Sequence, residues 1–378
     1  MNGPAQQGSM SPAAPLRMAF VFAGMPVGGA EDFALCAGTH LAPEFEAHYA
    51  CLRELGRLGQ EARDAGRPVH LVRVFPSRWI TPWHIRRFAA WLRREKISLV
   101  HSQTYHAHVF ATRAARLIGI PSVVHQQKTL GELPRRRERI FRACLHRSAH
   151  VVALSCRTAG EIASDYGVPE SKISTVHNGI EQSVFRPTSD RELLRRELGL
   201  PSGGLLVGTV ARLHPHKNHA LTIEAVARLR GEGITVTAVL VGEGAQRAEL
   251  ENLARARGVH NAVIFAGGRR PVAPWIQALD IFVLPSVWEG QPLALLQAVA
   301  CGVPVLASKI EGNIDVLGAD HPGLFGADDA GSLAGLITTS VRDPDFTPGL
   351  LALQKRIVVP WSHEAAGQLA TIYRSLLP

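Results

Sequence analysis

Cysteine is scarce in this sequence, and its arrangement argues against two kinds of site. The five cysteines are far apart, and no two of them form a Cys-x-x-Cys pair (Cys36, Cys51, Cys144, Cys156 and Cys301). A disulfide framework or a thiolate zinc site would need closely spaced, paired cysteines. The pattern therefore predicts a reducing, cytoplasmic compartment.

Long apolar runs are absent as well. A membrane-spanning helix needs roughly 18 mostly apolar residues, whereas the most apolar segment, residues 293–307, is interrupted by Gln297, Gly302 and Pro304. Residues 1–15 have neither a basic start nor an apolar centre, so we do not expect a secretory signal there. Their composition predicts a disordered tail.

Acidic residues are too few to balance the basic ones. Lysine and arginine total 41, against 32 aspartates and glutamates, which gives a formal net charge of +9 and a pI near 9.7. This balance favours anionic partners such as phosphorylated ligands, an anionic membrane surface or nucleic acid. Charge alone does not choose among them.

The sequence does contain a regular alternation of short apolar runs and helical patterns. The apolar runs that suit strands buried on both faces are 18–23, 69–74, 98–102, 122–125, 151–155, 205–211, 235–241, 262–266, 281–285 and 303–308. Helical patterns lie between them, for example at 30–41, 107–117 and 221–230. This alternation predicts parallel sheets covered on both faces. The chain is long enough for two doubly wound, Rossmann-like α/β domains, which we place at 16–187 and 188–360 with a boundary in the polar segment 185–204.

Two glycines follow the first predicted strand. Gly28 and Gly29 would let the backbone turn tightly and approach a ligand, and Glu31 and Asp32 suit the first turn of the next helix. An ordinary strand-to-helix turn is the alternative interpretation. The segment is not Gly-x-Gly-x-x-Gly, which argues against a dehydrogenase.

Two cations occupy the loop after the first strand of the second domain. Arg212 and Lys217 lie in ARLHPHKNH, and a guanidinium fork beside a lysine charge suits a diphosphate. Solvent-facing charge is the alternative. The loop histidines have no cysteine or carboxylate close by in the sequence, so we expect no metal site (His214, His216 and His219).

A glycine pair followed by two arginines comes later, in FAGGRR. Gly267 and Gly268 would let backbone groups face a flat base, and Arg269 and Arg270 would contact either phosphate or water. These residues follow another predicted strand, where ligands bind in doubly wound sheets.

The segment PSVWEGQPLALLQAVACGVPVLAS, residues 285–308, carries the most informative spacing. Glu289 precedes a helical pattern and Gln297 lies about two turns further, so the two share one face. Backbone N–H groups near Leu293 would point toward an anion. Glu289 can accept hydrogen bonds from sugar hydroxyls, and Gln297 can reach a ribose diol. An N-terminal acid with a satisfied core amide is the alternative.

From about residue 16 to the end, the sequence resembles glycosyltransferase family 4. The matching segments are VGGAE (27–31), VHNGIEQSVFRP (176–187), ARLHPHKNH (211–219), LVGEG (240–244), LPSVWEGQPLALLQAVACGVPVLAS (284–308) and WSHEAAGQLATIYRSLL (361–377). The resemblance implies a retaining, metal-independent enzyme of the GT-B fold that needs no cofactor. It also implies that a C-terminal helix, 361–378, crosses back to the first domain.

The resemblance assigns roles to residues noted above. Arg212 and Lys217 would hold the diphosphate of a nucleotide-sugar donor, and Glu289, the first acid of the family's E-x7-E element, would meet the donor sugar. The remaining donor-binding candidates are Gly28, Gly29, Gly268, Arg269, Gly290, Gln291, Pro292, Leu293 and Gln297.

Three glutamines depart from the family pattern. Gln297 replaces the second acid of E-x7-E. This change should weaken the affinity for the donor more than it alters the geometry of the contact. Gln127 stands where the family often has a histidine near the reacting sugar, and Gln103 replaces the second histidine of an HxH element. Glutamine keeps hydrogen bonding but does not titrate near neutrality. Because a front-face substitution needs no enzyme nucleophile, these changes should slow the enzyme or shift its substrate. The acceptor-side candidates are His101, Gln103, His106 and His125.

Positive charge is concentrated in two helical segments of the first domain, 83–96 and 133–150, where Trp, Phe, Leu or Ile lie between the cations. Amphipathic basic helices of this kind can lie on an anionic bilayer, and a solvated helix face is the alternative. We expect an anionic, membrane-held glycolipid acceptor and contact with the inner face of the plasma membrane. No nucleic-acid-binding motif is present.

The sequence thus predicts a hexosyltransferase that uses a nucleotide-diphosphate-sugar, with UDP preferred over GDP, in lipopolysaccharide, capsule or exopolysaccharide assembly. Two alternatives remain. A non-catalytic GT-B protein that binds a nucleotide sugar or a partner would explain the three glutamines. A sugar-nucleotide epimerase would need acid–base groups of which the sequence offers few.

Overall fold

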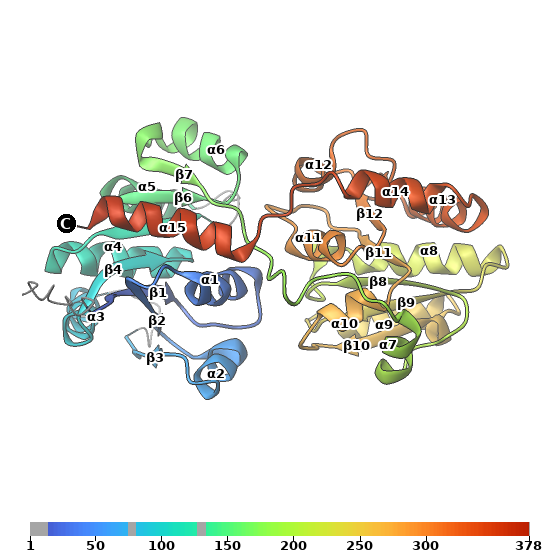
Figure 1. Ribbon diagram of the computed structural model, residues 1–378, viewed down its shortest axis with the longest axis horizontal. Coiled ribbons are helices and arrows are strands. Elements are labelled where there is room, and N and C mark those ends of the chain that lie inside the picture. Colours follow the sequence, from blue (N-terminus) through green and yellow to red (C-terminus); the bar gives the residue numbers. More distant parts are fainter. Residues whose placement is uncertain (1–13, 75–80, 127–133, 378) are drawn as a thin grey trace, which may run out of the picture. The chain divides into compact units, whose positions relative to one another are not determined.

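The computed structural model describes residues 14–74, 81–126 and 134–377 (Figure 1). The chain divides into two compact units. The first unit comprises Met1–Val176 and His363–Pro378, and the second comprises His177–Ser362. Each is a sheet covered by helices, as the alternation in the sequence predicts.

The first unit is built on a seven-stranded parallel sheet with the order β3-β2-β1-β4-β5-β6-β7. Its strands are β1 (Leu16–Phe22), β2 (Phe45–Cys51), β3 (Val69–Leu71), β4 (Ile97–Ser102), β5 (Ser122–Gln126), β6 (His150–Ala153) and β7 (Ile173–Thr175). Because the strand order reverses beside β1, the sheet is doubly wound. Its helices are α1 (Gly29–His40), α2 (Gly56–Asp64), α3 (Pro82–Arg94), α4 (Tyr105–Ile118), α5 (Arg135–Arg147), α6 (Cys156–Tyr166) and α15 (Ser362–Leu376).

Side-chain alternation along β1 explains how the first sheet is covered. Met18 and Phe20 point to one face and pack with α1 and α15, while Ala19 and Val21 point to the other face and pack with α3 and α4. Tyr373 of α15 is completely buried in the first of these clusters. The C-terminal helix therefore belongs to the first unit, which confirms the predicted return of the chain.

The second unit contains a six-stranded parallel sheet with the order β10-β9-β8-β11-β12-β13. Its strands are β8 (Leu205–Val210), β9 (Val236–Val241), β10 (Val263–Gly267), β11 (Ile281–Leu284), β12 (Val305–Ser308) and β13 (Leu324–Phe325). Its helices are α7 (Arg191–Leu198), α8 (His219–Gly231), α9 (Arg247–Ala256), α10 (Ala273–Gln277), α11 (Leu293–Ala300), α12 (Glu311–Leu317), α13 (Ala330–Arg342) and α14 (Phe346–Gln354). Separate apolar clusters lie on the two faces.

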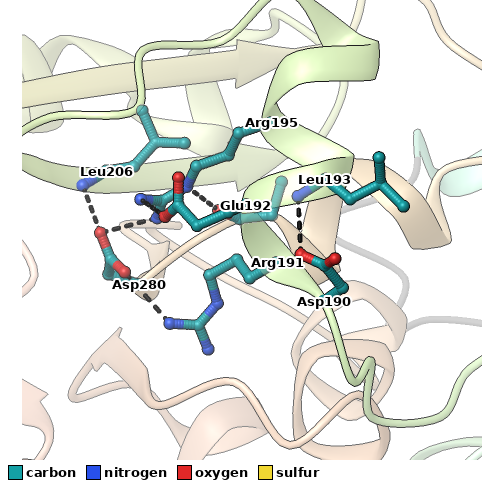
Figure 2. Close-up of polar contacts among 8 residues, drawn as sticks. Asp190, Arg191, Glu192, Leu193, Arg195, Leu206 and Asp280 are labelled. Atoms are coloured by element: carbon teal, nitrogen blue, oxygen red, sulfur yellow. Dashed lines mark hydrogen bonds and ion pairs between the residues drawn. The ribbon is translucent and has the colours of Figure 1, made fainter.

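The segment 185–204, in which the sequence analysis places the domain boundary, contains α7 and packs onto the second unit. Phe185 joins one apolar cluster of that unit. Figure 2 shows how α7 is fixed: Arg195, whose side chain is only 4% exposed, lies 2.8 Å from Asp280 and donates from Nε to the Ala278 carbonyl at 2.9 Å. Asp280 also accepts from the Leu206 N–H at 2.7 Å. The division at residues 176 and 177 therefore lies upstream of the predicted boundary.

The chain passes between the two units twice, and the two passages run beside each other. The Ile180 N–H donates to the Pro360 carbonyl at 2.8 Å, and the Ser362 N–H donates to the Ile180 carbonyl at 3.0 Å. A Cβ added at Gly179 would lie 2.4 Å from the Ser362 Cα, so only glycine allows this approach. None of the helices in the described part of the chain is long and apolar enough to cross a bilayer.

Candidate functional site

An ion pair joins the two loops that follow the adjacent strands β8 and β11. Lys217 Nζ lies 2.5 Å from Glu289 Oε1, and the two side chains are 17% and 9% exposed. The Ser286 hydroxyl donates to the same carboxylate oxygen at 2.6 Å. The structure thus brings together two of the residues that the sequence predicts for one site, although they are 72 positions apart.

A polar network that the sequence did not reveal supports the turn before Glu289. The Ser308 hydroxyl donates to the Ser286 carbonyl, and Asn313 Nδ2 donates to the Ser308 carbonyl at 2.9 Å. A Cβ at Gly312 would lie 2.5 Å from the Glu289 carbonyl oxygen. The glycine at 312 was the one available signal, since the partners of Asn313 depend on the tertiary fold.

The loop that carries Lys217 is braced by its own histidine. His219 is buried, which lowers its pKa to about 4, so the ring is neutral near pH 7. Its Nε2 lies 3.1 Å from the Arg212 carbonyl, and the neutral ring must donate there because a carbonyl only accepts. Asn218 just before it adopts a left-handed conformation with φ of 49°. The side chain of Arg212 is exposed at this loop.

The loops that carry Lys217 and Glu289 also contact each other through the residues just before these two. His216 stacks on Trp288 with ring centroids 4.6 Å apart, and the Val287 N–H donates to the His216 carbonyl at 2.8 Å. A third loop approaches from β9, where a Cβ at Gly242 would lie 1.9 Å from the Ala211 carbonyl oxygen. The backbone around Lys217 is therefore held from two sides.

The turn between Glu289 and α11 is tied to the segment 177–181. The Asn178 N–H donates to the Gln291 side-chain oxygen at 2.7 Å, and Asn178 is buried. Gln291 is one of the donor-binding candidates, and the contact of its side chain with Asn178 was not predicted. Pro292 precedes the helix, Leu293 begins it, and Gln297 is half-buried further along. The first N–H groups of α11 have no partner within the helix.

The glycine and arginine residues after β10 are arranged locally. Gly267 has φ of 77°, in the left-handed region of backbone conformation, whereas φ of Gly268 lies outside that region. Arg269 Nε donates to the Ala266 carbonyl at 2.7 Å, and its guanidinium lies 5.5 Å from the centroid of the Trp275 ring. Arg269 is therefore folded against its own turn, an arrangement that neither sequence interpretation included.

The acceptor-side histidines of the first unit lie in its interior. His101 and His125 are fully buried with ring centroids 5.2 Å apart, and His101 Nδ1 lies 2.5 Å from the Tyr373 hydroxyl. Burial lowers the pKa of His125 to about 3 and that of His101 well below its usual value. They contact the core and α15 rather than solvent, so their acceptor role stays a prediction.

The remaining predicted residues of the first unit are placed as follows. Gln103 is buried, His106 is half-buried in the first turn of α4, and Gln127 lies outside the described residues. Gly28 precedes α1 with φ of −172°, an extended conformation that any residue adopts. Gly29 begins the helix. The turn therefore does not need glycine for its backbone angles.

Two sequence families match the chain. The description "Glycosyltransferase Family 4" matches residues 27–184, and "Glycosyl transferases group 1" matches residues 190–352. Together they cover both units.

Individual proteins give the same result. The chain is 30% identical over 336 residues to the D-inositol 3-phosphate glycosyltransferase of Acidothermus cellulolyticus, covering 78% of this chain and 72% of that protein. It is 29% identical over 235 residues to the UDP-Gal:alpha-D-GlcNAc-diphosphoundecaprenol alpha-1,3-galactosyltransferase of Escherichia coli, covering 59% of this chain and 60% of that protein.

A solved structure supports the fold. HepE of Anabaena in complex with UDP-glucose superposes with a TM-score of 0.82 at 22% identity, and the match covers 96% of this chain and 100% of that chain. At this identity the likeness concerns the fold alone. The resemblance seen in the sequence is confirmed: the chain belongs to the family 4 glycosyltransferases and has their two-domain, Rossmann-like GT-B fold.

Proposed function

We propose that the protein is a retaining glycosyltransferase that moves a sugar from a nucleotide-diphosphate-sugar to a saccharide or glycolipid, without a metal ion. The observation that carries this proposal is the half-buried Lys217–Glu289 pair at the carboxyl edge of the second sheet. The glycosyltransferases to which the chain is related make a non-catalytic role the less favoured alternative.

The pair has a chemical consequence for a bound donor. Glu289 Oε1 is occupied by Lys217 and Ser286, which leaves Oε2 to accept from a hydroxyl of the donor sugar. Lys217 is already fixed, so little side-chain entropy is lost when its charge meets a diphosphate. The exposed Arg212 supplies a fork for the same group, and the N-terminus of α11 adds backbone donors.

These groups suit a front-face substitution. The acceptor oxygen bonds to the anomeric carbon on the face from which the diphosphate leaves, and a phosphate oxygen takes the acceptor proton. The enzyme then needs only to stabilise the developing negative charge and to position the acceptor. This route explains why buried, neutral histidines and three glutamines need not prevent reaction.

The names of related proteins support UDP as the donor nucleotide and a lipid-linked acceptor. HepE binds UDP-glucose, and the E. coli relative uses a diphosphoundecaprenol-linked saccharide by its name. For this chain we propose an anionic glycolipid acceptor at the inner face of the plasma membrane, in lipopolysaccharide, capsule or exopolysaccharide assembly. The chain covers about three fifths of the length of that relative.

A thermal-shift panel of UDP-, GDP-, ADP- and TDP-sugars tests the donor class. A ligand at about 100 times its Kd stabilises the native state by about 2.7 kcal/mol, which for a unit of this size is a rise of roughly 5 to 10 °C. We expect this shift for UDP-sugars. If no nucleotide sugar shifts the midpoint, the proposal fails.

Two variants test the ion pair. Glu289→Ala removes the sugar contact but frees the charge of Lys217, so we expect transfer to be lost while UDP binds at least as tightly. Lys217→Ala should weaken UDP binding. Glu224→Ala is the matched control, because Glu224 pairs with Arg257 on the exposed surface of the same unit at 2.8 Å. Unchanged turnover in Glu289→Ala would remove Glu289 from the site.

A further inference from the structure

Three neighbouring helices of the first unit carry a dense set of arginines. Helix α3 packs against α4, and α4 packs against α5. Their inner sides are buried against the sheet through Phe88, Phe110 and Phe141. The outward residues we call the arginine face: Arg86, Arg87, Arg93 and Arg94 of α3, Arg113 and Arg116 of α4, and Arg135, Arg136, Arg137, Arg139 and Arg147 of α5, all of them exposed.

The strand register places these helices on one side of the sheet. Val21 aligns with Ser102, Ser102 with Val124, and aligned residues of a parallel sheet point to the same face. Val21 packs with α3 and α4, and Val124 packs with Phe141 of α5. The sequence had suggested two separate basic helices; the fold joins them through α4 (Figure 1).

The arginine face accounts for the charge of the whole protein. The three helices contain four, two and six arginines, no lysine, and one acid, Glu138, which gives +11. Since the chain as a whole carries +9, the remaining residues sum to −2. Two of the twelve are paired with acids: Arg142 contacts Glu138 and the Tyr166 ring, and Arg94 lies 3.0 Å from Glu95, the residue that follows α3. The positive field is therefore local to this face and does not reflect a generally basic protein.

Apolar side chains lie exposed among these cations. Trp83 is 59% exposed, with the Arg87 guanidinium 5.4 Å from its ring centroid, and Leu117 beside Arg116 is 50% exposed. Tryptophan beside arginine is typical of the water–lipid interface, where the ring enters the headgroup layer and the cation meets phosphate. A phosphate polymer such as RNA would match the charge but would leave the exposed Trp and Leu without a function on a helical face.

We propose that the arginine face binds the phosphate layer of an anionic phospholipid bilayer. This inference rests on the proposed membrane-held acceptor and adds the surface that would bring the enzyme to it. It needs neither a donor nor turnover, so it can fail or hold independently of the glycosyl transfer.

Vesicle sedimentation of the full chain tests the proposal. We expect binding to phosphatidylcholine vesicles that contain about 30% phosphatidylglycerol, no binding to pure phosphatidylcholine, and weaker binding as salt is raised. Each arginine near an anionic surface contributes roughly a five-fold factor, so Arg135→Gln, Arg137→Gln and Arg139→Gln together should lower the partition coefficient about a hundredfold. The lysine versions of the same three should restore binding.

The matched control removes the same charge elsewhere. Arg196→Gln, Arg255→Gln and Arg342→Gln change three exposed arginines of the second unit, and we expect less than a threefold effect. Trp83→Ala should weaken binding at high salt, where the field is screened. Equal loss in the test and control triples, or loss in the lysine triple, would overturn the proposal. Binding of RNA in preference to anionic vesicles would overturn it too. A UDP-sugar thermal shift on the same variants keeps this result separate from donor binding.

Discussion

The cluster around Asp280 makes a quantitative prediction about stability. Asp280→Asn keeps the shape and the acceptor for the Leu206 N–H but removes the charge opposite Arg195 (Figure 2). The Arg195 side chain is 4% exposed, and its other acid, Glu192, lies 3.4 Å away with a side chain 52% exposed. Removing one partner of a buried pair costs about 3 to 5 kcal/mol. Because Asp280 is 23% exposed, we expect the lower end, about 3 kcal/mol.

The assay is calorimetry or urea unfolding of the full chain, with the transition of the second unit followed. A loss of about 3 kcal/mol in a unit of this size lowers its midpoint by roughly 6 to 12 °C. Glu224→Gln is the control, since its solvent-exposed pair with Arg257 should contribute little to stability, so we expect almost no change in the midpoint.

The position of Asp280 also predicts how its substitution affects UDP binding. Asp280 and Leu206 lie at the amino ends of β11 and β8, whereas Lys217 and Glu289 follow the carboxyl ends of the same strands. UDP affinity measured well below the transition should therefore stay unchanged. A destabilisation no larger than that of the control would refute the claim that this pair anchors α7.

Three further outcomes are expected. His108 and His125 are buried, which lowers the pKa of each to about 3. In the unfolded chain the pKa of a histidine is about 6.5, so between these two pH values the unfolded state binds more protons than the folded state. As the pH falls from 6 to 4, each histidine should lower the free energy of unfolding by about 1.4 kcal/mol per pH unit. In denaturation curves recorded at several pH values, the free energy of unfolding of His108→Gln should therefore depend less steeply on pH. Gln297→Glu should tighten UDP binding by roughly five-fold in calorimetric titration, because a charged acceptor adds about 1 kcal/mol; weaker binding would argue against a ribose contact. Gly312→Ala should reduce transfer, since its Cβ would lie 2.5 Å from the Glu289 carbonyl oxygen, and full activity would show that the turn tolerates displacement.

Most strands could be predicted from their short apolar runs, whereas β2, β7 and β13 were not identified. Residues 45–51 were not identified as a strand because Glu46 and His48 interrupt the apolar run. In the structure His48 is buried, 3.1 Å from His70 of the neighbouring strand and 3.1 Å from Glu46. A polar residue can occupy a buried strand when its partners come from the next strand, and sequence alone does not show those partners.

The candidate site, too, could be predicted only in part from the sequence. The residue types at 217 and 289 indicated charge chemistry, but their direct pairing depends on β8 and β11 being neighbours. Asn178 and Asn313 could not be assigned for the same reason, since both act through contacts with distant turns. The burial of His101 could not be seen in the sequence either, because α15, from a distant part of the chain, covers it with Tyr373.

The side-by-side passages at Ile180 and Ser362 have a consequence for how the protein can be divided. The second unit is one uninterrupted stretch, His177–Ser362, so a gene fragment with those limits encodes a whole structural unit. The first unit is discontinuous: an N-terminal fragment that stops at residue 176 would lack α15 and leave the apolar face around Phe20 and Tyr49 bare. In architectural terms, the second unit is an insertion into a host unit, and α15, which completes the core of the host, is translated only after the insertion has been made.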